Sequence, residues 1–148
     1  MDNILFQAHS GFRFIVLILL VIAFITALTG WMANRDYTDG NKKINLFTLI
    51  SAHIQLLIGI GLYFVSPYVK LDNMGAAMKD SNLRFWTVEH AIIMILAIVL
   101  ITVGYSKSKK TLNNVAKHKK IAIFFGIALV LIFAGILMGG RPLLGISR

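Results

Sequence analysis

Residues 14–34 read FIVLILLVIAFITALTGWMAN and contain no charged side chain between Arg13 and Arg35. An α-helix rises 1.5 Å per residue, so a stretch of this length crosses the roughly 30 Å hydrocarbon core of a bilayer. Three further apolar stretches follow, at residues 44–69, 85–106 and 121–140. Only Glu89 interrupts the stretch at 85–106. None of them shows the alternating polarity of membrane β-strands. The sequence therefore predicts an all-α fold, an integral membrane four-helix bundle.

The composition is typical of a chain that is embedded in a membrane. Of the 148 residues 57% are hydrophobic and only 14% are charged, with a formal net charge of +9. A soluble domain carries about 25% charged residues, so the bilayer is the more natural solvent. The chain has no cysteine, which excludes disulfides, thiolate metal sites, thioether-linked haem and a cysteine nucleophile. Its chemistry must use histidine, a carboxylate or a bound cofactor.

The apolar stretches indicate one transmembrane domain, residues 1–148, without a separate soluble domain. We expect helices at about 4–33, 44–66, 83–106 and 114–139, in up-down topology. Lysine and arginine are more frequent in the connections near residues 35–43 and 107–120 than on the opposite side. Both termini are therefore expected on the non-cytoplasmic side. This topology already accounts for the positive charge, so no nucleic acid partner is expected.

Four histidines, one in or beside each expected helix, are the candidates for chemistry: His9, His53, His90 and His118. Ionisable side chains within a bilayer are costly and usually face the interior of a bundle for a functional reason. His53 and His90 could instead be neutral side chains that hydrogen-bond to a neighbouring helix, and His9 could simply lie at the membrane interface. For His118, within the sequence KHKK, a solvated basic residue is the simpler interpretation.

Depth in the expected helices sorts the histidines into two pairs. A b-type haem held between helices needs two imidazoles from different helices at one depth. His9 and His90 both belong to the outer half of the bundle, and His53 and His118 both belong to the inner half. Pairing His53 with His90 would leave them roughly 12 Å apart along the membrane normal. The sequence thus predicts one or two b haems, with all four histidines as metal ligands.

Arg13 and Glu89 are expected near the outer boundary, and several roles stay open for them. They could form an ion pair between helices. Arg13 could instead bind a haem propionate, because its guanidinium matches a carboxylate in a two-pronged contact. Glu89 could exchange protons at a quinone. A non-haem metal site built from His9, His90 and Glu89 is a further option.

Four segments carry a resemblance to known proteins: HSGFR (residues 9–13), SAHIQLLIGIGLYF (51–64), VEHAIIMILAIVL (88–100) and KHKKIAIFFGIALVLIFAGI (117–136). They resemble small bacterial four-helix membrane proteins described as cytochrome b or cytochrome b-like, and the architecture is similar to that of the cytochrome b561 family. Four-helix members of that family hold two b haems and exchange electrons with quinone. The resemblance therefore implies a multi-pass protein of the bacterial inner (cytoplasmic) membrane, with its four histidines as axial haem ligands.

The leading interpretation is a membrane b-type cytochrome-like protein that exchanges electrons with quinone or a respiratory partner. The alternative is a non-catalytic accessory or assembly subunit of a membrane respiratory complex. Its histidines would form interhelical hydrogen bonds, and the step from Gly135 to Gly139 would serve helix packing. A proton-coupled carrier that uses Glu89 is a third option, although no broken helix or inverted repeat supports it.

Overall fold

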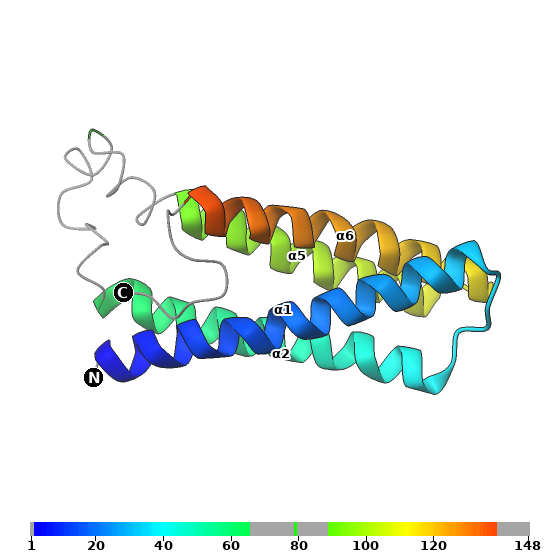
Figure 1. Cartoon of the computed structure of the whole chain (residues 1–148), viewed down its shortest axis with the longest axis horizontal. Coiled ribbons are helices and arrows are strands. Elements are labelled where there is room, and N and C mark those ends of the chain that lie inside the picture. The colour runs from blue at the N-terminus through cyan, green and yellow to red at the C-terminus, as the bar shows by residue number, and fades with distance from the viewer. Residues whose placement is uncertain (1, 66–78, 80–88, 139–148) are drawn as a thin grey trace.

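The computed structural model describes residues 2–65, 79 and 89–138, and its helices are labelled in Figure 1. Four long helices make up nearly all of this part of the chain: α1 (Asp2–Met32), α2 (Asp39–Val65), α5 (His90–Lys110) and α6 (Asn114–Met138). The described residues contain no strand, so the predicted all-α class is confirmed. Each of these helices is long and apolar enough to cross a membrane.

Three helices extend beyond a predicted end, and α1 does so by two residues, at Asp2. α2 begins at Asp39 rather than at residue 44, because Thr38 and Asn41 cap it reciprocally. The main-chain N–H and the hydroxyl of Thr38 each donate to Asn41 Oδ1 at 2.9 Å, and the Asn41 N–H donates to Thr38 Oγ1 at 3.2 Å. α5 continues to Lys110, with lysines in its last turn, where positive charge favours a helix end. The predicted helix positions outside the described residues are 66, 83–88 and 139.

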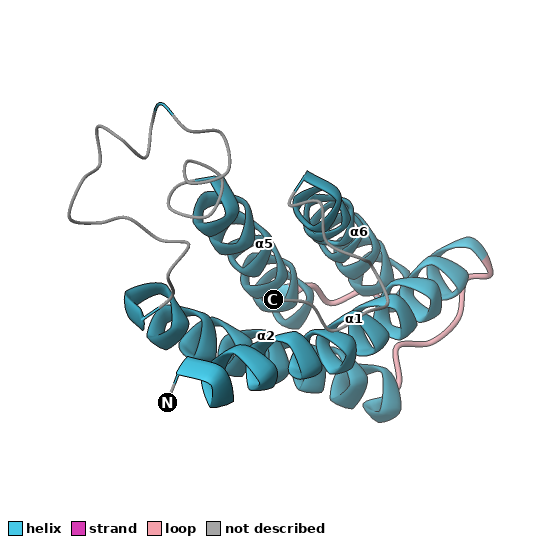
Figure 2. Cartoon of the chain, turned by 60° about the vertical axis from the view of Figure 1, so that its left-hand side comes forward, coloured by secondary structure: helices cyan, strands magenta, loops and turns pink. Residues whose placement is uncertain are grey.

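The helices form two pairs. α1 lies beside α2 and α6, and α5 lies beside α6 and α2, so α1 and α5 occupy opposite corners of the bundle. We call the end where residues 33–38 and 111–113 join the helices the loop end, and the end where α1 begins the terminal end. The α1–α2 pair and the α5–α6 pair separate toward the terminal end (Figure 1). Figure 2 shows the same two pairs from another side.

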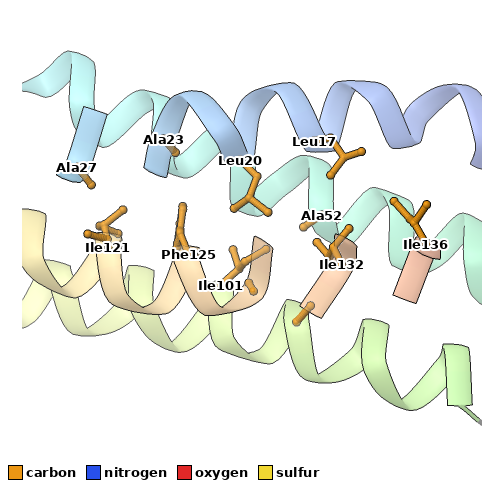
Figure 3. Close-up of a cluster of buried hydrophobic side chains, with 13 residues drawn as sticks. Leu17, Leu20, Ala23, Ala27, Ala52, Ile101, Ile121, Phe125, Ile132 and Ile136 are labelled. Carbon is orange, nitrogen blue, oxygen red and sulfur yellow. The ribbon is translucent and has the colours of Figure 1, made fainter. Parts of the chain in front are cut away.

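The core lies mainly between α1 and α6, where apolar side chains of both helices meet (Figure 3). Leu20 of α1 and Phe125 of α6 are both fully buried. The buried α1 residues recur at three- and four-residue spacing, as a single helix face requires: Leu17, Leu20, Ala23 and Ala27. α5 and α2 add smaller contributions to the same cluster, among them Ile101 and Ala52.

Large apolar side chains also cover the outside of all four helices. Examples on the four helices are Ile18 (58% exposed), Leu57 (69%), Leu96 (50%) and Val130 (67%). Soluble proteins rarely expose contiguous apolar surface on this scale, whereas lipid-facing helices require it. The four candidate spans therefore suggest a multi-pass membrane protein.

Candidate functional site

The structure brings together the two histidines of the predicted outer pair at the terminal end. The rings of His9 on α1 and His90 at the start of α5 have centroids 6.3 Å apart, and their planes are inclined by 77°. Because these helices occupy opposite corners of the bundle, the two side chains meet across its interior. Two imidazoles from different helices thus lie at one depth.

Arg13 belongs to the same face of α1 as His9. Arg13 follows His9 by four positions, and the core residue Leu17 follows Arg13 by four more, so all three lie on one helix face. The buried face of α1 is therefore apolar at Leu17 and polar toward the terminal end. The Nδ1 atoms of His9 and His90 and the Nε atom of Arg13 are all buried. The Arg13 guanidinium also lies 5.0 Å from the centroid of the Phe14 ring.

α2 closes one side of this site with Gln55 and Gly59. Gln55 Nε2 donates to the main-chain oxygen of His9 at 2.9 Å. Gln55 Oε1 is buried and accepts no hydrogen bond from the described residues. A Cβ at Gly59 would lie 3.4 Å from Cε1 and 3.7 Å from Nδ1 of His9, so the edge of that ring rests against α2. We call His9, Arg13, Gln55, Gly59 and His90 the terminal-end site.

Sequence reasoning missed Gln55, although a signal for it exists. Its amide interrupts an apolar stretch, and polar side chains in such stretches usually face the bundle interior. Gln55 follows Thr48 by seven residues and Asn45 by ten, which is helical spacing, and both of those side chains are buried. A polar inward face of α2 could have been read from this spacing. Its contact with His9 could not, because it depends on how α1 and α2 pack.

The separation of the two rings is compatible with an iron held by two imidazoles, and also with a direct edge-to-face contact between the rings. Histidine nitrogens bind metals at about 2 Å, and the ring centre lies about 1 Å behind the nitrogen, so two imidazoles on opposite sides of one iron have centroids about 6 Å apart. The observed separation is 6.3 Å. An inclination of 77° is compatible, since each ring can turn about its bond to the metal.

The option of a non-haem metal site at His9, His90 and Glu89 finds no support. Among the described residues, no three His, Cys, Asp or Glu side chains come close enough to hold one metal ion. Glu89 occupies the N-cap position of α5 without a side-chain capping bond. The ion pair of Arg13 with Glu89, the propionate contact and the proton exchange at a quinone stay predictions.

His118 lies at the loop end, between α6 and α1. It is 2% exposed, and its Nε2 donates to the main-chain oxygen of Asp36 at 3.0 Å. Its ring faces Gly30, where a Cβ would lie 2.6 Å from three ring carbons, and the Tyr37 ring centroid is 5.2 Å away. The interpretation of His118 as a solvated basic residue is therefore wrong. The side chain ties α6 to the α1–α2 connection.

His53 lies in the seam between α2 and α5 and is exposed. Its Nδ1 is 2.8 Å from the main-chain oxygen of Leu49, and because a carbonyl only accepts, Nδ1 carries the proton. Its Nε2 is 3.4 Å from Thr102 Oγ1, whose hydroxyl donates to the main-chain oxygen of Ile98 at 2.8 Å. His53 is thus bonded within its own helix through Nδ1 and faces Thr102 of α5 through Nε2.

The structure does not bring His53 and His118 together. His118 contacts Asp36, which precedes α2, whereas His53 lies fourteen residues beyond Asp39, the first residue of α2. At 1.5 Å per residue this is roughly 21 Å along the bundle. Two ligands of one iron need nitrogens about 4 Å apart. The structure therefore does not bring the two histidines of the predicted inner pair together, whereas it does bring together His9 and His90; metal binding by any of them stays a prediction.

Comparisons with protein-family models, with curated proteins and with solved structures find no match to this chain. Its function is therefore argued from the terminal-end site and from the apolar helices that carry it.

Proposed function

We propose that this chain is a multi-pass protein of the bacterial cytoplasmic membrane and works as a b-type cytochrome-like electron-transfer protein. His9 and His90 hold one b haem, and the chain exchanges electrons with quinone or a respiratory partner. The observation that carries the proposal is the 6.3 Å separation of two imidazole rings from helices at opposite corners of the bundle. One haem replaces the one or two expected from sequence, because the other two histidines lie apart.

The remaining residues of the terminal-end site have supporting roles. The haem, when bound, supplies a one-electron couple that needs no bond to substrate. Gln55 holds the main chain of His9 by its 2.9 Å hydrogen bond and so fixes where that imidazole sits. Arg13, one turn from His9, brings a positive charge that suits a propionate carboxylate. The adjoining core, which begins at Leu17, excludes water from the inner side of the site.

Insertion in a bilayer is supported by the exposed apolar side chains on all four helices. The lysines gathered at the loop end support its placement in the cytoplasm: Lys42, Lys43, Lys107, Lys109, Lys110, Lys117, Lys119 and Lys120. The terminal-end site then lies toward the non-cytoplasmic side, together with both termini.

The haem content of the purified protein tests the proposal. The chain is expressed with ample haem supply and purified in mild detergent, and reduced-minus-oxidised spectra are recorded with the haem-to-protein ratio. We expect a b-type spectrum at one haem per chain. His9→Ala and His90→Ala should each lower the haem-to-protein ratio and change this spectrum, because each removes one of the two imidazoles that would hold the haem. His53→Ala is the matched control, since it removes an exposed imidazole and keeps the haem.

Three results would overturn the proposal. The first is a native protein without haem. The second is two haems per chain, which would require ligands that the structure separates. The third is a loss of haem in His53→Ala as severe as in His9→Ala. Electron exchange with quinone is tested separately, by adding a reduced quinone analogue to the oxidised protein and following the reduced b-type band.

An accessory or assembly subunit is the second candidate, and the contacts of two histidines favour it. This alternative gives the histidines hydrogen bonds between helices. His118 hydrogen-bonds to Asp36 in the α1–α2 connection, and His53 faces Thr102 of α5. Gly135 also behaves as a packing glycine, since a Cβ there would lie 2.6 Å from Met94 Cε; Gly139 lies outside the described residues. A haem-free chain that co-purifies with a larger complex would favour this candidate.

A further inference from the structure

A cavity of about 310 Å³ opens at the loop end, and we call it the loop-end pocket. It is lined by residues of α1, the α1–α2 connection, α2 and α6: Thr26, Gly30, Arg35, Asp36, Thr38, Asn41 and His118. One wall is the ring of His118, a side chain that is 2% exposed. The pocket lies roughly 30 Å along α1 from His9, so it does not belong to the terminal-end site.

The end of α1 sets Arg35 at this pocket. Asn34 adopts a left-handed conformation with φ of 53°, which asparagine tolerates better than most residues. The chain then turns back, and the main-chain N–H of Arg35 donates to the oxygen of Gly30 at 2.9 Å, which is a common way to end a helix. Arg35 therefore stands where the apolar helix ends and the polar connection begins.

Two of the side chains that line the pocket, Arg35 and Asn41, can donate hydrogen bonds to a ligand. Asn41 Oδ1 accepts from both the main chain and the hydroxyl of Thr38, so the amide nitrogen of Asn41 is the part left to donate. Arg35 has only donors. Asp36 is the acid among the lining residues, and its Oδ1 accepts from Asn114 Nδ2 at 3.3 Å. Arg35 and the amide nitrogen of Asn41 can therefore donate to an oxyanion, while one oxygen of the Asp36 carboxylate is bonded toward α6.

The surroundings and the depth of the pocket specify the oxyanion further. Lys119 Nζ lies 5.7 Å from the Trp31 ring and Lys117 Nζ lies 5.5 Å from the Tyr37 ring. Trp31 follows the lining residue Gly30 and Tyr37 follows the lining residue Asp36, so both lysines belong to the same end of the bundle as the pocket. From Arg35 the pocket reaches back to Thr26, roughly 14 Å along the apolar helix α1. Its polar end therefore lies at headgroup depth and its other end lies within the hydrocarbon. An amphiphile with a phosphate at one end and an apolar chain at the other matches the polar end and the apolar end of the pocket.

We propose that the loop-end pocket binds the phosphate group of an anionic phospholipid. Arg35 and the amide nitrogen of Asn41 donate to the phosphate oxygens, and the apolar part of the lipid leaves along Thr26 and Gly30. Inorganic phosphate shares the headgroup chemistry but lacks the apolar part. A bound lipid joins the α1–α2 connection to α6, and its binding does not depend on the proposed haem site.

Lipid titration of the purified full chain tests this proposal. Phosphatidylglycerol, phosphatidylcholine and inorganic phosphate are each added in detergent, and bound molecules are counted by native mass spectrometry. We expect saturable binding of phosphatidylglycerol that Arg35→Ala and Arg35→Gln weaken about tenfold or more, as loss of a charged hydrogen-bond donor does. Thr26→Leu weakens it without changing charge, because it fills the apolar end of the pocket. Thermal unfolding shows that each variant is folded.

Lys110→Ala is the matched control, because Lys110 is exposed at the same end and does not line the pocket. It leaves the phosphatidylglycerol affinity within about twofold of the native value, since screened surface charges act weakly. Equal losses in Lys110→Ala and Arg35→Ala overturn the proposal, because binding then follows total charge. Equal affinity for phosphatidylcholine overturns the preference for an anionic lipid. If equimolar inorganic phosphate displaces phosphatidylglycerol, the pocket binds free phosphate rather than a lipid, and the proposal is overturned.

Discussion

Gly30 of α1 and the ring of His118 of α6 are in close contact. A Cβ at Gly30 would lie 2.6 Å from three carbons of the His118 ring. The ring cannot retreat, because its Nε2 is bonded to the oxygen of Asp36 and Tyr37 lies against it. A hydrogen atom in place of a methyl group therefore allows α6 to pack on α1 at the loop end.

Substitution of this glycine tests the contact. Gly30→Ala should lower the stability by about 1–3 kcal/mol, the usual cost of overpacking a rigid interior. Gly11→Ala is the matched control on the same helix, because a Cβ there meets nothing within 4 Å. It should be neutral or stabilising by up to about 1 kcal/mol through helix propensity. Thermal unfolding in detergent measures both, and equal effects of the two variants would contradict the structure.

The histidines themselves could be found from sequence, but their partners could be found only in part. An imidazole in an apolar stretch is conspicuous, and the structure places His9 beside His90, as the depth argument expects. The same argument did not bring His53 and His118 together. Two residues in one half of a span can differ in depth by about 15 Å, whereas the nitrogens of two ligands of one iron lie about 4 Å apart. The bond from His118 to Asp36 joins residues 82 positions apart and follows from tertiary packing.

At the scale of elements, small residues decide how closely α5 and α6 approach. A Cβ at Gly104 of α5 would lie 2.5 Å from the Cβ of Phe124 on α6, an atom fixed by its own backbone. A Cβ at Gly135 of α6 would lie 2.6 Å from Cε of Met94, the far end of a flexible side chain. The two glycines therefore differ in what must move to admit a methyl group.

This difference gives a prediction for the α5–α6 pair. Gly104→Ala should destabilise the protein by about 1–3 kcal/mol, because the two helices must separate. Gly135→Ala should cost less, since Met94 can change rotamer. Unfolding midpoints of the two variants, measured side by side in one detergent, provide the comparison. A greater loss in Gly135→Ala would show that Met94 is held more rigidly than its chemistry implies.

The α1–α2 connection gives a second prediction, through Tyr37. Burial raises the pKa of the Tyr37 hydroxyl above its usual value of 10.0, while hydrogen bonds with Asn45 and Ser108 lower it in part. The folded protein thus favours the neutral phenol. Stability from this group is fully present below about pH 10 and is lost as the pH rises above it, because the unfolded chain ionises first.

Tyr37→Phe isolates this effect from the titration of lysines in the same range. The difference in unfolding temperature between native protein and Tyr37→Phe should be constant from pH 7 to 9 and should shrink toward pH 11. The hydrogen bond from Asn45 Nδ2 to the Tyr37 hydroxyl, 2.8 Å long, is lost at every pH and sets the constant part. A difference that does not change up to pH 11 would contradict a buried phenol.

At the scale of the whole molecule, the two ends of the bundle carry different chemistry. The terminal-end site joins α1, α2 and α5 around two histidines, and the loop-end pocket joins α1, α2 and α6 around Arg35 and His118. An apolar core from Leu17 to Ala27 separates them. Helix number and class could be predicted because apolar length alone decides them. The pocket could not, because it depends on where Asn34 turns the chain.

The orientation of the bundle in the membrane is the last prediction, and the sequence makes it easy to test. The chain has no cysteine, so a single introduced thiol can be labelled without background. Leu112→Cys reports on the loop end, since Leu112 is 97% exposed in the α5–α6 connection. Lys79→Cys reports on the connection between α2 and α5, where Lys79 is exposed.

Because lysine-rich connections stay in the cytoplasm, a membrane-impermeant maleimide should label Lys79→Cys in intact spheroplasts and Leu112→Cys only after lysis. The cysteine-free chain, treated in parallel, gives the background. The reverse pattern would place the loop end outside the cell and the terminal-end site toward the cytoplasm. The proposed haem site would then exchange electrons with cytoplasmic rather than external partners, because electron transfer needs the site near the surface that the partner reaches.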